Sequence, residues 1–307
     1  MLEIDKQSPG WDRVIPDTGE PELVLSDFPN FIDGPVWDAA QGCLFLSEGW
    51  MNVRPGKIWK WRPGSAPELV LDGCKALGAT LDNDGRLVAC GWVGRNVWRL
   101  EHDGSITVLA SHYRGMRINT PNDLALHSSG AVYWTDQSRG LLGSGRAADG
   151  TDDMQRYLDF HSVMRVWPGS AHLEPVANDF EAPNGIVFSP DERLLYVNDT
   201  ARWHIRVFDV QPDGMLANGR IFYEAEPDLP GVFDGMKVDV EGNVYCTGPG
   251  GIHVIRPDGS LLVRIRFPEP VFNIAWGGPG WTSMFCTRLG SLYRIELKVP
   301  GVPVGKR

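Results

Sequence analysis

Aspartate and asparagine residues stand directly before short apolar segments at intervals along the chain. The positions are Asp33, Asn122, Asn184, Asp234 and Asn273, and glycine follows three of them. An Asp-Gly or Asn-Gly pair by itself predicts only a turn. If the fold brings these side chains together, however, their carboxylate and amide oxygens could bind a divalent cation and activate water for hydrolysis.

The segments between these positions predict one repeated β-rich unit. Each unit contains about four short strand-like runs, joined by turn sequences such as those at 84–85, 103–104 and 257–259. The units start at 33, 77, 122, 184, 234 and 273, which are 39 to 62 residues apart. Repeats of roughly 40 to 50 residues with four strands are typical of propeller blades. The sequence therefore predicts an all-β fold, a six-bladed β-propeller with four-stranded antiparallel blades.

We expect residues 1–307 to form a single propeller domain. The run ELVL at 22–25 is an isolated strand that should complete the sheet of the last blade, and residues 1–21 are interpreted as an N-terminal extension. The long interval between 122 and 184 indicates an inserted loop at 139–160, either a solvated surface loop or a flap over a pocket. A pair of β-sandwiches is the rival fold, but it would not explain the recurring polar residues.

In a propeller the first strand of each blade lines a central channel, so the residues that precede these strands converge at one mouth. Leu77 occupies this position in the second unit. Unpaired carboxylates and amides there would be costly to bury, and a bound divalent cation removes that cost. Loops between second and third strands emerge on the same face and supply candidate pocket and substrate-binding residues, with blade packing and a solvated rim as alternatives: Glu48, Trp50, Trp92, Gln137, Arg139, Asp199, Arg202 and Arg288.

Composition limits the partners that the chain could bind. Its formal net charge of −10 argues against nucleic acid and anionic membranes, which attract clustered lysine and arginine. No run approaches the roughly 20 apolar residues of a membrane span. The start of the chain lacks an apolar signal core, so a cytoplasmic protein is expected. The five cysteines have no CxxC spacing and are expected to be buried thiols rather than zinc ligands or disulfides.

Several motifs are specific as a set: DGPVW at 33–37, NTPND at 119–123, APNG at 182–185, SPDE at 189–192, LYV at 195–197 and DGMKVD at 234–239. Together they resemble the gluconolactonase/senescence-marker-protein (regucalcin) family, over about residues 22–300. TGPGG at 247–251 and KVPG at 298–301 are similar to its bacterial sugar-lactonase branch.

The resemblance implies a hydrolase that opens a small-molecule lactone, of sugar type, with one divalent metal ion. Ca²⁺ is expected first, with Mn²⁺, Zn²⁺, Mg²⁺ and Fe²⁺ as alternatives. The family's metal ligands fall on Asp33, Asn184 and Asp234, with Asn122 at or near the metal. The resemblance also makes Asp234 the general base, while Asn122 fixes the metal and orients the substrate. Residues just upstream of Asn122 often hold substrate hydroxyls in the family: here Arg117, Asn119 and Thr120.

Two departures from the family pattern bear on function. Asp33 stands where the family has Glu, which shortens its reach by about 1.5 Å. Leu77 stands where Asn is frequent, and Gly91-Trp92 replaces a Glu-His pair, so we expect a more apolar pocket side and a substrate less hydroxylated than an aldonolactone. Two other functions stay open: another metal-dependent ester or organophosphate hydrolase, and a non-catalytic metal-binding scaffold.

Overall fold

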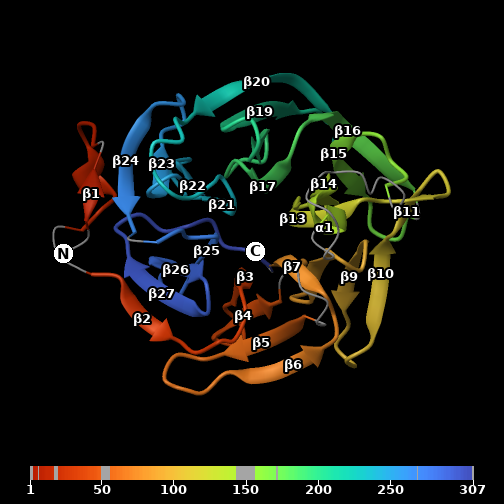
Figure 1. Ribbon diagram of the computed structural model, residues 1–307, viewed down its shortest axis with the longest axis horizontal. Coiled ribbons are helices and arrows are strands. Elements are labelled where there is room, and N and C mark those ends of the chain that lie inside the picture. Colours follow the sequence, from red (N-terminus) through yellow and green to blue (C-terminus); the bar gives the residue numbers. More distant parts are fainter. Residues whose placement is uncertain are drawn as a thin grey trace.

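The computed structural model describes residues 3–5, 7–16, 20–49, 56–142, 156–170, 172–267 and 269–305. Six antiparallel sheets are arranged around a central axis, and a short two-stranded hairpin belongs to none of them (Figure 1). Each of the six sheets has four strands, except one that gains a fifth. This arrangement confirms the predicted six-bladed β-propeller.

Within blades 1 to 3 the strands follow one another in sequence order, from the axis outward (Figure 1). Blade 1 comprises β3 (Ile32–Asp38), β4 (Cys43–Glu48), β5 (Lys57–Trp61) and β6 (Glu68–Asp72). Blade 2 comprises β7 (Ala76–Leu81), β8 (Leu87–Gly91), β9 (Asn96–Leu100) and β10 (Ile106–Ala110). A hairpin then leads to blade 3; its strands are β11 (His112–Tyr113) and β12 (Met116–Arg117). Blade 3 comprises β13 (Thr120–Leu126), β14 (Val132–Gln137), β15 (His161–Val166) and β16 (Leu173–Phe180).

Blades 4 to 6 repeat the pattern, and the N-terminal part of the chain closes the ring. Blade 4 comprises β17 (Pro183–Phe188), β18 (Leu194–Asp199), β19 (His204–Val210) and β20 (Leu216–Glu224). Blade 5 comprises β21 (Met236–Val238), β22 (Val244–Gly248), β23 (Gly251–Ile255) and β24 (Leu261–Arg266). Blade 6 comprises β25 (Asn273–Gly277), β26 (Ser283–Arg288) and β27 (Ser291–Glu296), and its outer strand is β2 (Glu22–Leu25). The isolated strand at 22–25 therefore completes the last blade, as the sequence predicted.

The residues before β2 do more than extend the chain. β1 (Ile4–Asp5) is the fifth strand of blade 5 and pairs with β24. After a 3₁₀ turn at Trp11–Arg13, the side chains of Val14 and Ile15 are buried in the apolar cluster between blades 5 and 6. This segment therefore covers an edge of blade 5 and contributes to the core.

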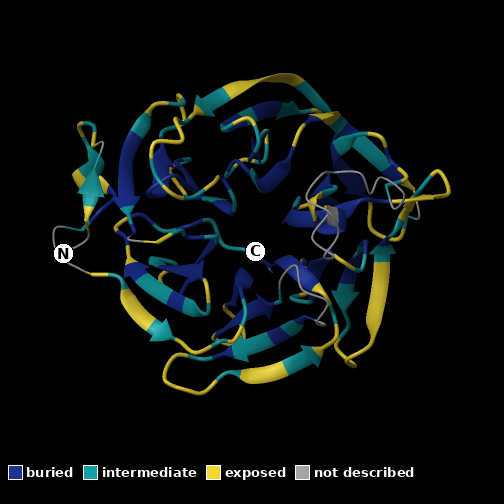
Figure 2. Ribbon diagram, in the orientation of Figure 1, coloured by how far each residue is buried: buried dark blue, intermediate teal, exposed yellow. Residues whose placement is uncertain are grey.

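The hydrophobic core lies between the blades. Six apolar clusters of described residues each fill one interface between neighbouring blades. The inner strands β3 and β7 are buried along their whole length, whereas the outer strands β6 and β10 expose most of their residues (Figure 2). Each inner strand is covered on both faces by neighbouring blades, and small and apolar residues accordingly make up most of β7.

The five cysteines are free thiols, as the sequence predicts, whereas the described ends of the insertion contain buried residues. Cys43, Cys90, Cys246 and Cys286 are buried and Cys74 is half-buried; none of the five forms a disulfide. The insertion begins with α1 (Arg139–Leu142), a single helical turn, and Leu158 near its end is buried between blades 2 and 3. Positions 143–155, where a flap was considered, and Trp50 lie outside the described residues.

No helix in the described ranges is both long and apolar enough to cross a membrane.

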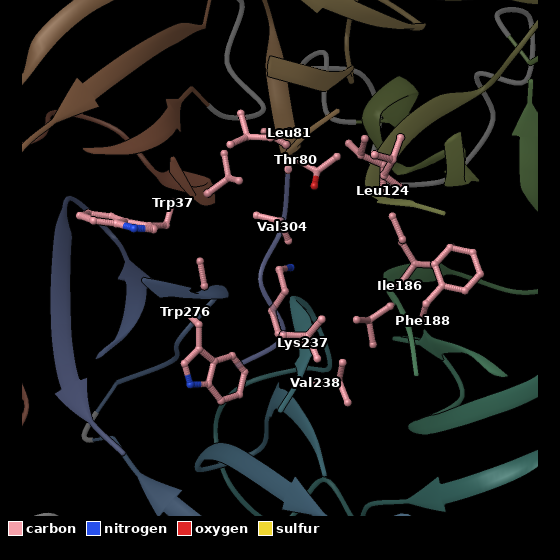
Figure 3. A pocket seen from close by; sticks show the side chains of 18 of the residues that line it. Trp37, Thr80, Leu81, Leu124, Ile186, Phe188, Lys237, Val238, Trp276 and Val304 are labelled. Carbon is pink, nitrogen blue, oxygen red and sulfur yellow. The ribbon is translucent and has the colours of Figure 1, made fainter. Parts of the chain in front are cut away.

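The C-terminal tail enters the channel at the end where the inner strands finish. Val302 N donates a hydrogen bond to Val238 O at 3.1 Å, and Val304 packs against the cluster between blades 1 and 2. A cavity of about 80 Å³ remains beside the tail, lined by apolar side chains from every blade and by Lys237 (Figure 3). The other mouth, where the inner strands begin, holds the residues discussed below.

The N-terminal segment can be tested by a core truncation. Ile15→Ala should lower the free energy of unfolding by about 2–5 kcal/mol, because a fully buried side chain leaves a cavity. Leu69→Ala, at a position with 50% of its surface exposed, should change it by less than about 0.5 kcal/mol. Urea unfolding of both variants measures the difference, and equal effects would show that the segment is not part of the core.

Candidate metal centre and active site

The inner strands begin with a ring of six quasi-equivalent residues. One repeated contact identifies them: a polar side chain on the second strand of one blade donates a hydrogen bond to the carbonyl of the ring residue in the next blade. The pairs are Ser47 Oγ to Leu77 O (2.7 Å), Thr135 Oγ1 to Asn184 O (2.7 Å), Asn198 Nδ2 to Asp234 O (2.7 Å) and Thr247 Oγ1 to Phe272 O (3.1 Å). Asp33 and Asn122 hold the corresponding positions in blades 1 and 3.

Glycine follows four ring residues because neighbouring blades approach closely there. A Cβ atom on Gly34 would lie 2.2 Å from Leu77 O, and one on Gly185 would lie 2.2 Å from Asp234 O. A Cβ on Gly78 would lie 2.6 Å from Asn122 O, and one on Gly235 would lie 2.1 Å from the side-chain Oδ1 of Asn273. Of these four glycines, Gly34 alone has a positive φ, of 49°. The repeated glycine is therefore explained by backbone packing between blades rather than by a series of tight turns.

The sixth ring position is Phe272, which corrects the placement of Asn273. In blades 3 and 6 the glycine is replaced by Asp123 and Asn273, whose Oδ1 atoms each accept the N–H of the following residue at 2.8 Å. Asn273 therefore lies one residue further along its strand than the ring, at the level of Asp123. The sequence analysis missed both Asp123 and Phe272; the signal was the absence of glycine in these two blades.

Burial and mutual repulsion dominate the electrostatics of the ring. Burial raises the pKa of Asp33 to about 7, against the hydrogen bond that its Oδ1 accepts from Gly34 N at 2.7 Å. Burial also raises the pKa of Asp234, and the nearby charges of Asp33 and Asp123 raise it further, although Asp234 keeps partial exposure to solvent. The side chains of Asn184 and Arg139 oppose this rise in the pKa of Asp234.

One lysine approaches this cluster from inside the channel. Lys237 Nζ lies 3.9 Å from Asp123 Oδ2 and donates a hydrogen bond to Met236 O at 3.1 Å; its side chain projects into the cavity (Figure 3). Its charge lowers the pKa of Asp33 and Asp123, but burial remains the larger effect and the pKa of both is raised. Lys237 and Arg139 thus face three carboxylates whose pKa values are raised, and an excess of negative charge arises only when Asp33, Asp123 and Asp234 are all ionised.

The donor set at the mouth fits a divalent cation. Asn184 Nδ2 donates to Thr200 Oγ1 at 3.3 Å, while Asn184 Oδ1 is buried without a hydrogen-bond partner. This orphaned oxygen, together with the carboxylates of Asp33 and Asp234, provides hard oxygen ligands that suit Ca²⁺, Mg²⁺ or Mn²⁺. No cluster of three His, Cys, Asp or Glu side chains with metal-binding geometry occurs in the described part of the chain, so the amide is essential to this candidate site.

Residues upstream of Asn122 divide between the pocket wall and the surface. Asn119 and Thr120 are fully buried; Asn119 Nδ2 donates to Phe160 O at 2.9 Å, and Thr120 Oγ1 donates to Gln137 O. Asn119 Oδ1 and Gln137 Oε1 are buried without partners, so both stay candidates for polar contacts. Arg117 is exposed on β12 and bonds Gly94 O at 2.8 Å, and no described contact places it beside the ring.

Two acidic candidates from the loops already have partners. Glu48 accepts hydrogen bonds from Asn30 Nδ2 and Trp59 Nε1, both at 2.7 Å. Asp199 accepts the N–H groups of Glu181 and Ala182 at 2.7 and 2.9 Å. Both carboxylates are completely buried, so we infer that they hold the chain in place rather than contact a substrate.

Three further loop candidates are Trp92, Arg139 and Arg202, of which the first two lie at α1. Trp92 is buried, and a Cβ on Gly140 of α1 would lie 2.7 Å from its Nε1. Arg139 begins α1, and its charge acts on Asp234 as described above. Arg202 bonds Asp179 O at 2.7 Å on the surface of blade 4. Trp92 and Arg139 therefore stay candidates for the pocket wall, whereas Arg202 fits a solvated rim.

Known proteins are similar to this chain in sequence and in fold. A family model described as "SMP-30/Gluconolactonase/LRE-like region" matches residues 31–290. Gluconolactonase from Zymomonas mobilis subsp. mobilis is 28% identical over 324 aligned positions, which cover 97% of this chain and 87% of that protein. Pentonolactonase from Haloferax volcanii is 27% identical, over 84% of this chain and 81% of that protein. A gluconolactonase structure from Xanthomonas campestris has a TM-score of 0.79 at 29% identity, covering 95% of this chain and 99% of that one. These matches confirm the resemblance that the motifs predicted.

The close approach of blades 4 and 5 gives a steric prediction. Gly185→Ala places a methyl group 2.2 Å from Asp234 O, so the blades must separate and Asp234 must shift. We expect a loss of about 1–3 kcal/mol in the free energy of unfolding, together with weaker binding of Ca²⁺ or Mn²⁺. Gly280→Ala is the matched control, because its methyl group would meet nothing closer than 3.6 Å. Denaturant unfolding and calorimetric metal titration measure both effects; wild-type values for Gly185→Ala would contradict the close packing.

The raised pKa of Asp33 predicts how the stability of the metal-free protein depends on pH. Its pKa rises from 3.8 in the unfolded chain to about 7 in the fold, so folding takes up a proton between these values. The metal-free protein should therefore lose stability as the pH rises from about 4 through 7. Asp33→Asn should remove this part of the dependence, so that its melting temperature exceeds that of the wild type increasingly toward pH 8. Parallel melting curves across this range would contradict the assignment.

Proposed function

Because the chain belongs to the SMP-30/Gluconolactonase/LRE-like family, we propose that it hydrolyses a lactone, a cyclic ester, at the ring mouth. The observation that carries this proposal is the convergence of Asp33 and Asp234 around the unpartnered Asn184 Oδ1. The gluconolactonases and the pentonolactonase to which the chain is similar support a lactone as the substrate class. The substrate is accordingly a small molecule that enters from the mouth at which the inner strands begin.

Asp33, Asn184 and Asp234 are the proposed ligands of one divalent cation, with Asn122 beside them. When bound, the cation supplies Lewis-acid polarisation of the lactone carbonyl and balances the charge of the tetrahedral oxyanion. Oxygen ligands alone favour Ca²⁺ first, and they also accommodate Mn²⁺, Mg²⁺, Fe²⁺ or Zn²⁺. Asp33 is shorter than the glutamate of the family pattern; its Oδ1 accepts a hydrogen bond from Gly34 N, and the side chain of Asn273 also bonds the carboxylate.

Asp234 is the proposed general base. It is partly exposed, so water can reach it, and its neighbours Asp33 and Asp123 favour proton uptake. In the proposed reaction a water oxygen attacks the lactone carbonyl carbon while Asp234 accepts a water proton. The ring C–O bond then breaks, and the proton passes to the departing alkoxide, which yields an open hydroxy acid. Asn122 and Asn184 orient the substrate without adding charge.

The proposal is tested by proton release from lactones after metal removal. EDTA should abolish turnover, and added Ca²⁺ or Mn²⁺ should restore it. Asp234→Asn should reduce kcat about 10²–10⁴-fold, because it removes the base. Asp258→Asn, in an exposed turn where the carboxylate bonds only Ser260 among the described contacts, should retain full activity. Metal content measured on each variant separates loss of the base from loss of the ligand.

Three outcomes would count against this function. Undiminished turnover in metal-free Asp234→Asn would contradict the mechanism. Hydrolysis of phosphotriesters or aryl esters in preference to every lactone would favour the other hydrolase classes instead. Metal binding without turnover of any ester would indicate a scaffold.

A further inference from the structure

We infer that the substrate presents an apolar face to the blade 6–blade 1–blade 2 side of the mouth, so that it is an alkyl- or aryl-substituted lactone rather than a polyhydroxylated one. The inference rests on the proposed lactone hydrolysis and names the substrate class of that same site. It follows from which ring residues are polar, which are apolar, and where the neighbouring polar groups are already engaged.

An apolar wall occupies half of the mouth. Phe31, Leu77 and Trp92 form one buried cluster, and the partly exposed Phe272 packs against it. The rings of Phe31 and Phe272 are 4.3 Å apart between centroids. Leu77 and Phe272 are the ring residues of blades 2 and 6, so they stand on either side of Asp33 in blade 1. We call these four side chains the apolar wall.

Apart from Asp33, the polar ring residues lie on the opposite arc. Asn122, Asn184 and Asp234 come from blades 3, 4 and 5, which follow one another around the axis (Figure 1). A lactone whose carbonyl lies at Asp33 and Asp234 would thus have amide donors and acceptors on one side only. Its other side would contact the apolar wall.

Two charged side chains near the wall are engaged elsewhere. In blade 1 the carboxylate of Glu48 is occupied by Asn30 and Trp59. In blade 6 the guanidinium of Arg288 pairs with Glu269 and lies 5.0 Å over the ring of Tyr293. Trp92 Nε1, beside Gly140 of α1, is buried without a hydrogen-bond partner and is the one unengaged donor of the described wall. Among the described residues, a substrate hydroxyl placed against Phe31, Leu77 or Phe272 would consequently lose its hydrogen bonds to water without replacement.

The expected preference is moderate in size. An apolar pocket rejects an added hydroxyl by about 10²-fold and discriminates a methylene by roughly 10–200-fold. We therefore expect kcat/KM for a δ-lactone with an alkyl chain to exceed that for δ-gluconolactone by at least about tenfold, after each is divided by its uncatalysed rate of hydrolysis.

The test compares these two lactones on the wild type and on wall variants. Leu77→Asn should lower the alkyl-to-gluconolactone ratio of kcat/KM at least about tenfold, and Phe272→Leu, which keeps an apolar side chain, should change it little. Leu69→Asn, on an exposed position of the outer strand β6, is the matched control and should leave the ratio unchanged. If Leu77→Asn does not fold, Leu77→Ala should still weaken the alkyl preference by removing contact area.

Failure of this inference and failure of lactone hydrolysis have different signatures. A wild type that hydrolyses δ-gluconolactone more efficiently than the alkyl lactone overturns the apolar face but leaves the lactonase standing. If no lactone is hydrolysed, calorimetric binding of the corresponding lactams, which resist hydrolysis, still measures the preference. Tighter binding of the alkyl lactam, lost in Leu77→Asn, supports the wall as a ligand surface; equal binding of both lactams overturns it.

Discussion

The close approach of inner strands at the channel mouth is the constraint on which the rest of the site depends. Gly34 and Gly185 leave no room for a Cβ against the next blade, and side chains such as Ser47 and Asn198 fix the carbonyl of the next ring residue. Backbone atoms therefore set the position of each ring residue. A site built on strands in this way holds its side chains more precisely than one built on loops.

The rigid ring holds several carboxylates close together. Burying them costs free energy that the folded protein by itself does not recover. Asp33, Asp123 and Asp234 repel one another in a buried cluster, with Lys237 as partial compensation. Protonation lowers the cost in the absence of a cation, and a divalent cation would lower it without protons. The same residues thus link stability to proton uptake and to cation binding, because both of these reduce the repulsion between the buried carboxylates.

Periodicity predicted the propeller and its closure by 22–25, because four strands per unit and a leftover strand are properties of the sequence alone. It also predicted five of the six ring positions. The sixth ring position was assigned to Asn273 instead of Phe272, because blade 6 lacks the glycine that marks the register elsewhere. Glu48 and Asp199 were expected to face the pocket, but their partners are groups brought from other segments, and a linear pattern does not reveal such encounters.

The ring also explains how one fold can change its substrate. Each blade contributes one ring residue, and in four blades a side chain of the preceding blade holds the carbonyl of that residue whatever its own side chain is. Leu77 is fixed by Ser47 just as Asn184 is fixed by Thr135. An amide or an apolar group can therefore occupy one ring position without disturbing the carboxylates at others. In the proposed site Asp33, Asn184 and Asp234 hold the cation, while Phe272 and Leu77, on either side of Asp33, set which face of a cyclic ester is recognised.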